Sequence, residues 1–322
     1  MISRRHLAAL AAAGLPSLAV AQSYPTRPIK MILPFPAGSA TDSAARFVAG
    51  ELRKNLGQAV VVENQVGADG LIATQNAKRS PADGYTILVS TNSGHGVNSA
   101  IFRELPYDPI KDFDPIGGLM RNPMMIMVAR NFPADDFAGF MAIARERSAS
   151  RPLTYGSGNT SGRVLGELLK ATARVDMLNV PYRGTPQVIQ DLVGGQIDVG
   201  CLDPVSAVGM IASGDIKVLA VADAMRTPAL PNVPTMAQVG LPGVEVVSWA
   251  AFFVPSGTDT AIVDRLNREI NAILRSPQTD QFITTLGATP MPMTPAQLRT
   301  FVAAEIPHWA RLVEIAGIER NR

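Results

Sequence analysis

The stretch of this sequence best suited to binding chemistry is Pro34 to Arg46, PFPAGSATDSAAR. A strand-like run, IKMILPF, leads into it and a helical pattern follows, so a small-residue loop joins a strand to a helix. The free N–H groups and the positive dipole end of that helix converge on the loop and would suit a carboxylate or a phosphate. An ordinary strand-to-helix turn also favours Gly, Ser and Thr, so the residues alone leave both interpretations open. No Lys follows the glycine at the spacing of a Walker loop, which argues against that nucleotide site.

Two other polar loops are candidate binding surfaces, because ligands of open α/β sheets gather at the carboxyl ends of strands. Each loop follows a predicted strand, and the second precedes another amphipathic helix. Every hydroxyl in them has an equally strong alternative role as a helix cap or a turn residue. The loop STNSGHG offers Thr91, Asn92 and Ser93, and the loop YGSGNTSG offers Ser157, Gly158, Thr160 and Ser161.

Three single residues complete the candidate site. Phe35 ends a strand and would form an apolar wall, although core packing is at least as common for such a residue. The planar fork of Arg183, in PYRGTP, suits a second carboxylate, with an ordinary surface arginine as the stronger alternative. Asp203 follows the strand-like run IDVGCL and would receive a ligand hydroxyl, an amine or a bridging water, or equally cap the next helix.

Catalytic chemistry has little support in the sequence. Its three histidines include His6 near the N-terminus, and His95 and His308 lie too far apart in sequence for a local metal motif. No HExxH, CxxC or GxSxG pattern occurs. A Ser/His/Asp group could still assemble in space, since triads are defined by geometry. We expect a binding protein that uses no metal, no cofactor and no catalytic residue.

Short strand-like runs alternate with amphipathic helical runs along the chain, which predicts an α/β fold of βαβ units around largely parallel sheets. With 322 residues and 47% hydrophobic content, the chain can bury a large core and form two domains. The first helix should begin just after the small-residue loop and end at Gly57. Thr294 and Gln297 form a capping box that opens the last helix, which Pro307 should kink or end.

The N-terminal segment from Met1 to Ala21 has the layout of a cleaved secretory signal. Arg4 and Arg5 precede an apolar run that closes with the small-residue triplet AVA, so the mature chain should start at Gln22. The run is shorter than the roughly 20 residues that cross a bilayer. We therefore expect an exported, periplasmic protein. The paired arginines leave the general secretory route and the twin-arginine route both open.

Charge and cysteine content narrow the possible partners. Removing Arg4 and Arg5 turns 29 Lys plus Arg into 27, which equals the 27 Asp plus Glu, so the mature net charge is near zero. This balance argues against a nucleic-acid or anionic-membrane partner. Cys201 is the single cysteine, so no internal disulfide can form and folding must depend on a hydrophobic core.

The loop at Pro34 to Arg46 resembles the signature loop of the tripartite tricarboxylate transporter substrate-binding proteins, the Bug family. The resemblance covers nearly the whole mature chain. Each motif alone is weakly specific, but their shared order and spacing are distinctive. Further family-like stretches are YPTRPIKMILPF, NQVGADG, LPYDPIKDFDPI, YGSGNTSG, VPYRGTPQVIQDLVGGQID and LPNVPTMAQVGLPG.

The resemblance implies a type II periplasmic binding protein, a Venus flytrap whose ligand cleft lies between two α/β lobes. Residues 22–125 and 246–322 would form lobe 1, and residues 126–245 would form lobe 2. In such families the first strand-to-helix loop holds a carboxylate through backbone N–H groups and ordered water. On this sequence those groups map to Ala37, Gly38, Ser39, Ala40, Thr41 and Asp42.

The resemblance also implies a function. A monomeric receptor would capture a small carboxylate by lobe closure and deliver it to the small and large membrane subunits of a tripartite transporter. The alternative is a sensor whose loaded form engages a membrane two-component kinase, and nothing in the sequence separates the two. Citrate-like tricarboxylates, C4 to C6 dicarboxylates, acidic amino acids and aromatic carboxylates are all candidate ligands. The few aromatic residues in the predicted loops favour an aliphatic acid.

Two departures from the family pattern bear on the ligand. The loop after the YGS tripeptide is shorter than is common and lacks a frequent histidine, and Arg163 lies near that place. Ser39 replaces the second glycine of a common pair and adds a hydroxyl to the first loop. These departures predict that the second-lobe contacts, and with them the ligand, differ from the common family pattern.

Overall fold

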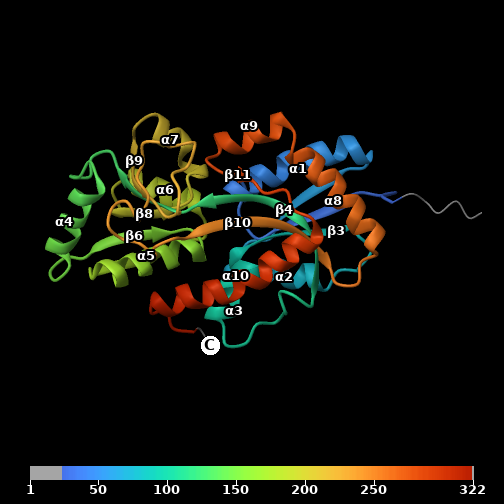
Figure 1. The fold of residues 1–322 in the computed structure, drawn as a ribbon, viewed down its shortest axis with the longest axis horizontal. Helices are drawn as coiled ribbons and strands as arrows, with labels where there is room; N and C mark the ends of the chain where they lie inside the picture. The colour runs from blue at the N-terminus through green and yellow to red at the C-terminus, as the bar shows by residue number, and fades with distance from the viewer. Residues whose placement is uncertain (1–23, 321–322) are drawn as a thin grey trace, which may run out of the picture.

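The computed structural model describes residues 24–320, so the predicted signal peptide lies outside the described residues. Two β-sheets, each flanked by helices, form two lobes that lie side by side along the long axis of the molecule (Figure 1). The predicted α/β alternation is confirmed by the element order along the chain.

The first lobe is built on a six-stranded sheet in the order β11-β4-β10-β3-β1-β2. The strands β1, β2 and β3 run parallel to one another, and β10 runs antiparallel to both β3 and β4. The strands are β1 (Ile29–Leu33), β2 (Val60–Asn64), β3 (Thr86–Thr91), β4 (Phe113–Pro123), β10 (Val247–Pro255) and β11 (Thr289–Pro290).

Alternate side chains of this sheet enter different hydrophobic clusters, as the period of a strand requires. Met31 and Leu33 pack in one cluster with helices α1, α8 and α9, whereas Ile32 packs in another with α2 and α10. The helices and turns are α1 (Ala40–Leu56), η1 (Ala68–Gly70), α2 (Leu71–Lys78), η2 (Ser93–Val97), α3 (Asn98–Ile101), α8 (Thr260–Leu274), α9 (Pro277–Thr285) and α10 (Pro295–Ile315).

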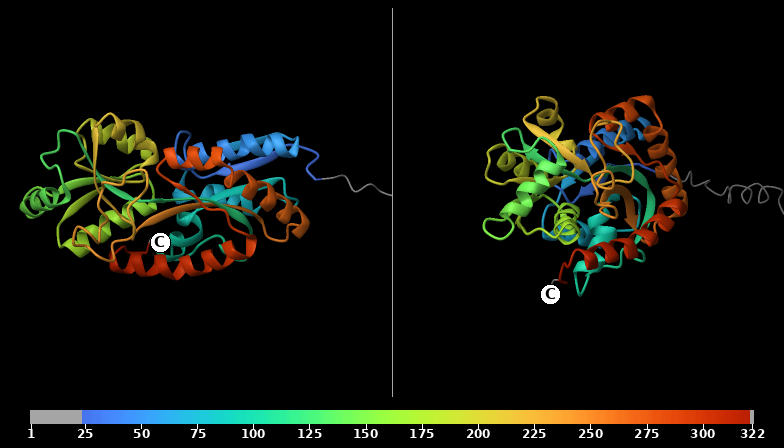
Figure 2. Two further views of the ribbon diagram at one scale, coloured as in Figure 1. Left: turned by 45° about the horizontal axis from the view of Figure 1, so that its top comes forward. Right: turned by 60° about the vertical axis from the view of Figure 1, so that its left-hand side comes forward.

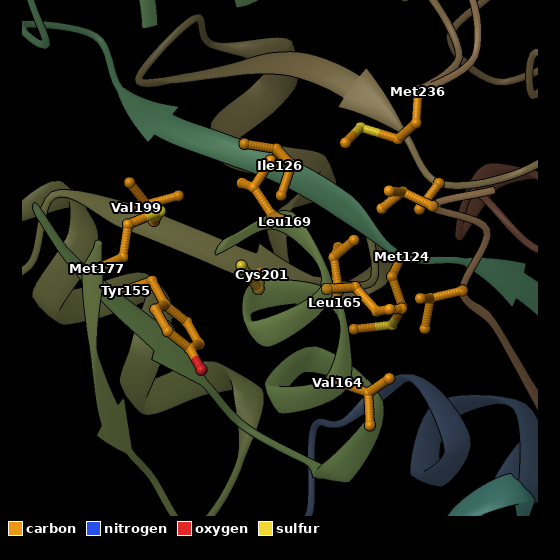
Figure 3. Packing of buried hydrophobic residues seen from close by; sticks show 14 of the residues in the cluster. Met124, Ile126, Tyr155, Val164, Leu165, Leu169, Met177, Val199, Cys201 and Met236 are labelled. Carbon is orange, nitrogen blue, oxygen red and sulfur yellow. The ribbon is translucent and has the colours of Figure 1, made fainter. Parts of the chain in front are cut away.

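The second lobe is built on a five-stranded sheet in the order β7-β6-β8-β5-β9. Its larger cluster packs Tyr155, Val199 and Cys201 of the strands against Leu165 and Leu169 of α5 (Figure 3). The elements are β5 (Met125–Ala129), α4 (Phe137–Arg147), β6 (Leu153–Ser157), α5 (Thr160–Ala173), β7 (Met177–Pro181), α6 (Thr185–Val193), β8 (Val199–Leu202), η3 (Val205–Ala207), α7 (Val208–Ala212) and β9 (Ile216–Val221).

The chain passes between the lobes at a junction of three hydrogen-bonded segments. Met124 alone separates β4 of the first sheet from β5 of the second. Its N–H donates to Val246 O (2.9 Å) and its carbonyl accepts from Ala222 N (2.8 Å), while Val246 N donates to Ala222 O (2.8 Å). The long strands β4 and β10 run from this junction into the first lobe (Figure 1).

Helix α1 ends at Gly57 as the sequence predicts, but it begins at Ala40, inside the loop PAGSAT after which it was expected to start. Ser39 caps its N-terminus by accepting a hydrogen bond from Asp42 N, and Gly57 ends it in the left-handed conformation with a φ of 68°. Arg53 and Lys54 lie in the last turn, where cations interact favourably with the helix dipole. The predicted capping box of Thr294 and Gln297 is likewise present at α10.

Helix α10 packs against both lobes and lies along one side of the molecule (Figure 2). Leu298 belongs to a first-lobe cluster, whereas Trp309 and Leu312 belong to the large cluster that contains the second-lobe core. The helix does not end at Pro307 but continues to Ile315. Burial of the apolar side chains beyond the proline offsets the hydrogen bond that Pro307 cannot donate.

We expect Trp309→Ala to lower the free energy of unfolding by about 3–5 kcal/mol, because the indole is 1% exposed and its removal leaves a cavity between the lobes. Urea unfolding followed by circular dichroism measures the change. The control is Ile315→Ala on the same helix, where the side chain is 51% exposed and the change should stay within about 0.5 kcal/mol. Equal effects of the two variants would contradict this account of α10.

Candidate functional site

A cavity of about 1190 Å³ lies between the lobes. The first lobe contributes the loop after β1, the segment Val66–Gly70 and the end of β3. The second lobe contributes the start of α5 and the turn between β7 and α6. These segments follow strands in both sheets, which is where open α/β folds bind ligands.

Half of the sequence-predicted site residues line this cavity. They come from all three predicted loops and from the PYRGTP turn: Phe35, Ala37, Thr91, Ser93, Ser157, Gly158, Thr160 and Arg183. The others are absent from its lining: Gly38, Ser39, Ala40, Thr41, Asp42, Asn92, Ser161 and Asp203. Ligand contact by either group stays a prediction.

The loop that opens α1 satisfies several of its own hydrogen-bond donors. Gly38 N donates to Asp42 Oδ2 (3.0 Å), Ser39 N donates to Pro36 O (3.3 Å), and Asp42 N donates to Ser39 Oγ (3.3 Å). Gly38 has a φ of 81°, a conformation that glycine adopts without strain. The anion at this helix N-terminus is therefore the protein's own carboxylate, and of residues 37–42 Ala37 alone lines the cavity.

Asp42 is held as a carboxylate by its surroundings. Burial opposes ionisation, but hydrogen bonds from Arg46 Nε (2.9 Å), Asn64 Nδ2 (2.8 Å) and the backbone of Gly38 outweigh burial and lower the pKa of Asp42. Asn64 also donates to Phe35 O (2.8 Å). This network ties β2 to the loop and fixes the loop at the cavity edge.

The polar residues after β3 divide into two groups. Thr91 lines the cavity, and its buried Oγ1 has no hydrogen-bond partner among the described residues. Asn92 is fully buried and bridges the lobes instead, because its Nδ2 donates to Ser161 Oγ (2.5 Å) and its Oδ1 accepts from Ser248 Oγ (2.8 Å). Asn92 and Ser161 thus bind each other across the cleft.

The second-lobe wall depends on a close backbone approach at Gly158. A Cβ at this position would lie 2.4 Å from Thr185 N, so only glycine fits there. Asn159 caps α5 by accepting a hydrogen bond from Gly162 N (2.9 Å). Ser157 Oγ donates to Asn179 Oδ1 (3.0 Å), which joins β6 to β7 at the cavity wall.

The charged residues that line the cavity carry more positive than negative charge. Among the described lining residues, Arg163, Arg183 and Asp69 carry charge. Arg163 is half-buried in α5, and its guanidinium makes no hydrogen bond or ion pair with any residue of 24–320. A guanidinium that is partly desolvated and lacks an anion is a ready receptor for a carboxylate.

Asp203 is buried outside the cavity lining. Its Oδ1 accepts a hydrogen bond from Val205 N (3.3 Å) at the start of η3, although the N-cap residue of η3 is Pro204. Burial raises the pKa of Asp203 to about 6. Trp249, in the crossing strand β10, is 2% exposed and packs edge-on against Phe301 in the core.

Sequence reasoning missed several residues that line the cavity. The NQVGADG stretch supplies Ala68 and Asp69, both in the left-handed region with φ of 47° and 52°, a strained geometry that is frequent at functional sites. Its flanking glycines were the available signal. Other polar lining residues that were missed are Ser90, Asn159, Asn179, Tyr182 and Gln187, which no local pattern distinguishes from ordinary polar residues of strands, turns and helices. The part of the chain that the structure describes has no group of three His, Cys, Asp or Glu residues that could hold a metal ion.

The sequence that forms these two lobes matches a known family. The family model described as "Tripartite tricarboxylate transporter family receptor" matches residues 44–318. The chain belongs to this receptor family. This is a family of solute-binding receptors and not of enzymes, so its description assigns the chain a binding role.

Relatives agree over nearly the full length of the chain. It is 34% identical to BugT of Bordetella pertussis over 309 residues, which cover 96% of this chain and 95% of that protein. The structure of Rpa4515 of R. palustris with adipate superposes with a TM-score of 0.89 at 33% identity, covering 92% of this chain and all of that one. MatC of Rhodopseudomonas palustris with bound malate gives a TM-score of 0.83 at 33% identity, covering 90% of this chain and all of that one.

These superpositions confirm the predicted fold class, a two-lobe periplasmic-binding-protein fold of type II. Within residues 24–320, no helix of this receptor combines the length and the apolar character needed to cross a membrane.

We expect the buried carboxylate of Asp42 to stabilise the receptor in a pH-dependent way. Because folding lowers the pKa of Asp42 below its usual 3.8, the stabilisation is present above that pH and is lost as the pH falls through the lower folded value. Asp42→Asn should therefore cost about 1–3 kcal/mol at pH 7, and the difference from wild type should shrink below about pH 4. Urea unfolding across this pH range measures it.

The matched control is Asp280→Asn, an exposed carboxylate in the first turn of α9. This variant should change stability by less than about 0.5 kcal/mol at every pH. A cost for Asp42→Asn that does not depend on pH would contradict the role of the ionised carboxylate.

Proposed function

We propose that this receptor captures a small organic carboxylate in the cavity between its lobes and delivers it to the small and large membrane subunits of a tripartite transporter. The observation that carries the proposal is the half-buried Arg163, which lines the cavity without an ion-pair partner among the described residues. The relatives with adipate and malate support a carboxylate as the ligand class.

The cavity has groups on both lobes that could contact opposite ends of one organic acid. Arg163 and Arg183 lie on the second lobe, while Thr91 and Ala37 lie on the first, so a ligand that contacts both sides would hold the lobes together. A hydrogen bond to a charged group contributes roughly 1.5–3 kcal/mol. Three or four such bonds, less the cost of association, support affinity of about 8 kcal/mol, which is roughly micromolar.

Lobe closure is the step that makes a loaded receptor distinguishable from an empty one. We infer two moving bodies, residues 22–125 with 246–322 and residues 126–245, because the sheet changes close to these bounds, with β5 of the second sheet beginning at Met125 and β10 of the first sheet at Val247. The lobes already meet across the cleft at Asn92 and Ser161, and a Cβ on Gly184 would approach Pro36 to 2.7 Å. The small contact residues would let the cleft close further around a ligand.

Location and assembly follow from the same proposal. The chain would be exported to the periplasm, lose residues 1–21 and act as a monomer, since a receptor must be free to visit its membrane partner. N-terminal sequencing of the protein from the periplasmic fraction should begin at Gln22.

The direct test is binding of carboxylates to residues 22–322 after removal of any co-purified ligand. A thermal-shift screen with adipate, malate, succinate and citrate should give a saturable rise in melting temperature with at least one acid, because a ligand of the folded state stabilises it. The corresponding amides and a set of phosphate esters should give none. A protein that responds to phosphate esters but to no acid would overturn the proposal.

Arg163→Gln should weaken the Kd of the best acid about 10- to 150-fold, because one charge-assisted interaction worth about 1.5–3 kcal/mol is lost. Isothermal titration calorimetry measures the Kd. Arg174→Gln is the matched control, since Arg174 is an exposed arginine at the C-terminal end of the same helix. An unchanged Kd for Arg163→Gln would remove Arg163 from the site.

A further inference from the structure

A buried Ser–His pair lies at the end of β3, beside the cavity. Ser90 is 1% exposed and lines the cavity, and its Oγ lies 2.7 Å from His95 Nδ1. His95 sits in the π-helical turn η2, a rare geometry that often marks functional sites. Sequence reasoning assigned no role to either residue.

The other side of the His95 ring is apolar. The ring stacks on Phe253 at a centroid distance of 4.0 Å and lies 5.2 Å from Phe113. Its Nε2 has no hydrogen-bond partner among the described residues. Burial lowers the pKa of His95 to about 3, so the ring is neutral at physiological pH and carries one N–H.

The position of that single proton decides which way the Ser90 hydroxyl points. With the proton on Nε2, a buried N–H donor would remain unsatisfied between aromatic rings, which is rare and costly in folded proteins. With the proton on Nδ1, the N–H donates to Ser90 Oγ, the Nε2 lone pair lacks a partner, and the Ser90 hydroxyl proton turns away from the ring. The second arrangement costs less, because buried acceptors are left unpaired more often than buried N–H donors.

The Nδ1-protonated ring leaves the Ser90 hydroxyl proton without an acceptor among the described residues, since His95 Nδ1 is the only hydrogen-bond partner of Ser90 Oγ there. Of the neighbouring hydroxyls, Thr74 Oγ1 donates to Gly70 O (2.9 Å) and Tyr107 Oη donates to Gly94 O (2.7 Å). A Cβ on Gly94 would lie 2.7 Å from Ser90 Oγ, so glycine is needed for this packing. The cavity is the remaining direction for the proton.

We propose that Ser90 donates a hydrogen bond to a carboxylate oxygen of the ligand and that His95 is the positioning residue that holds the hydroxyl as a donor toward the cavity. This inference rests on the proposed function, because it names a further contact of the same site. The unpartnered Oγ1 of Thr91 next to it gives the end of β3 a second free hydroxyl. An ionised carboxylate, which only accepts hydrogen bonds, is the group that this surface recognises.

Three variants measured against adipate, malate, succinate and citrate by calorimetry test the role of the pair. Ser90→Ala and His95→Phe should each weaken the best acid by about 10-fold or more, since each removes the oriented donor. The double variant should be no weaker than Ser90→Ala alone, because both changes remove one interaction. His95→Asn should restore most of the affinity, since its Nδ2 can donate from nearly the same position as Nδ1.

The control is Thr279→Val, which removes a fully buried hydroxyl in α9, outside the cavity lining, and should leave the Kd unchanged. The tautomer gives a readout that does not depend on the variants folding. Residues 22–322 labelled with 15N-histidine contain only His95 and His308, and the long-range 1H–15N spectrum should show the His95 proton on Nδ1.

A proton on Nε2, or a Ser90→Ala variant that binds like wild type, would overturn this inference and leave carboxylate capture intact. Failure of the wild-type protein to bind any of the four acids would instead count against the proposed function itself.

Discussion

The junction between the lobes is the constraint on which the rest of the structure depends. Met124, Ala222 and Val246 hydrogen-bond to one another where the chain passes from one sheet to the other. Because β4 leads into β5 with a single residue between them, the two sheets stay joined at this edge, and loops that follow strands of both lobes face one cleft. Helix α10 reinforces this arrangement by packing against both lobes.

The polar groups in and around the cleft are of two kinds. Some form hydrogen bonds with other residues of the protein, and others have no partner among the described residues. The carboxylate of Asp42 receives bonds from Gly38, Arg46 and Asn64, so it builds the loop. Arg163 and Thr91 line the cavity without a partner among the described residues. Buried or half-buried polar groups that lack protein partners are costly, and a bound acid would satisfy them.

The buried His95 does not line the cavity itself but contacts Ser90, which does. His95 is neutral and held between aromatic rings, so its single proton can be fixed by the one polar neighbour available, Ser90. A hydroxyl would otherwise rotate freely between donor and acceptor roles. A neutral buried His95 can thus decide whether the Ser90 hydroxyl donates or accepts a hydrogen bond at the cavity, and no charge has to be placed in the core.

The sequence by itself determined the α/β class, the C-terminal end of α1, the capping box of α10 and, through ordered family motifs, the receptor family, because these depend on local propensity, periodicity and spacing. Only the tertiary structure decided which polar residues face the cavity. Asn92 and Ser161 matched the pattern of ligand residues but bind each other, whereas Ser90 and Arg163 gained their places from neighbours far away in the chain. Side-chain partners at long range have no local signature, so the sequence predicted the loops of the site but not the role of each residue within them.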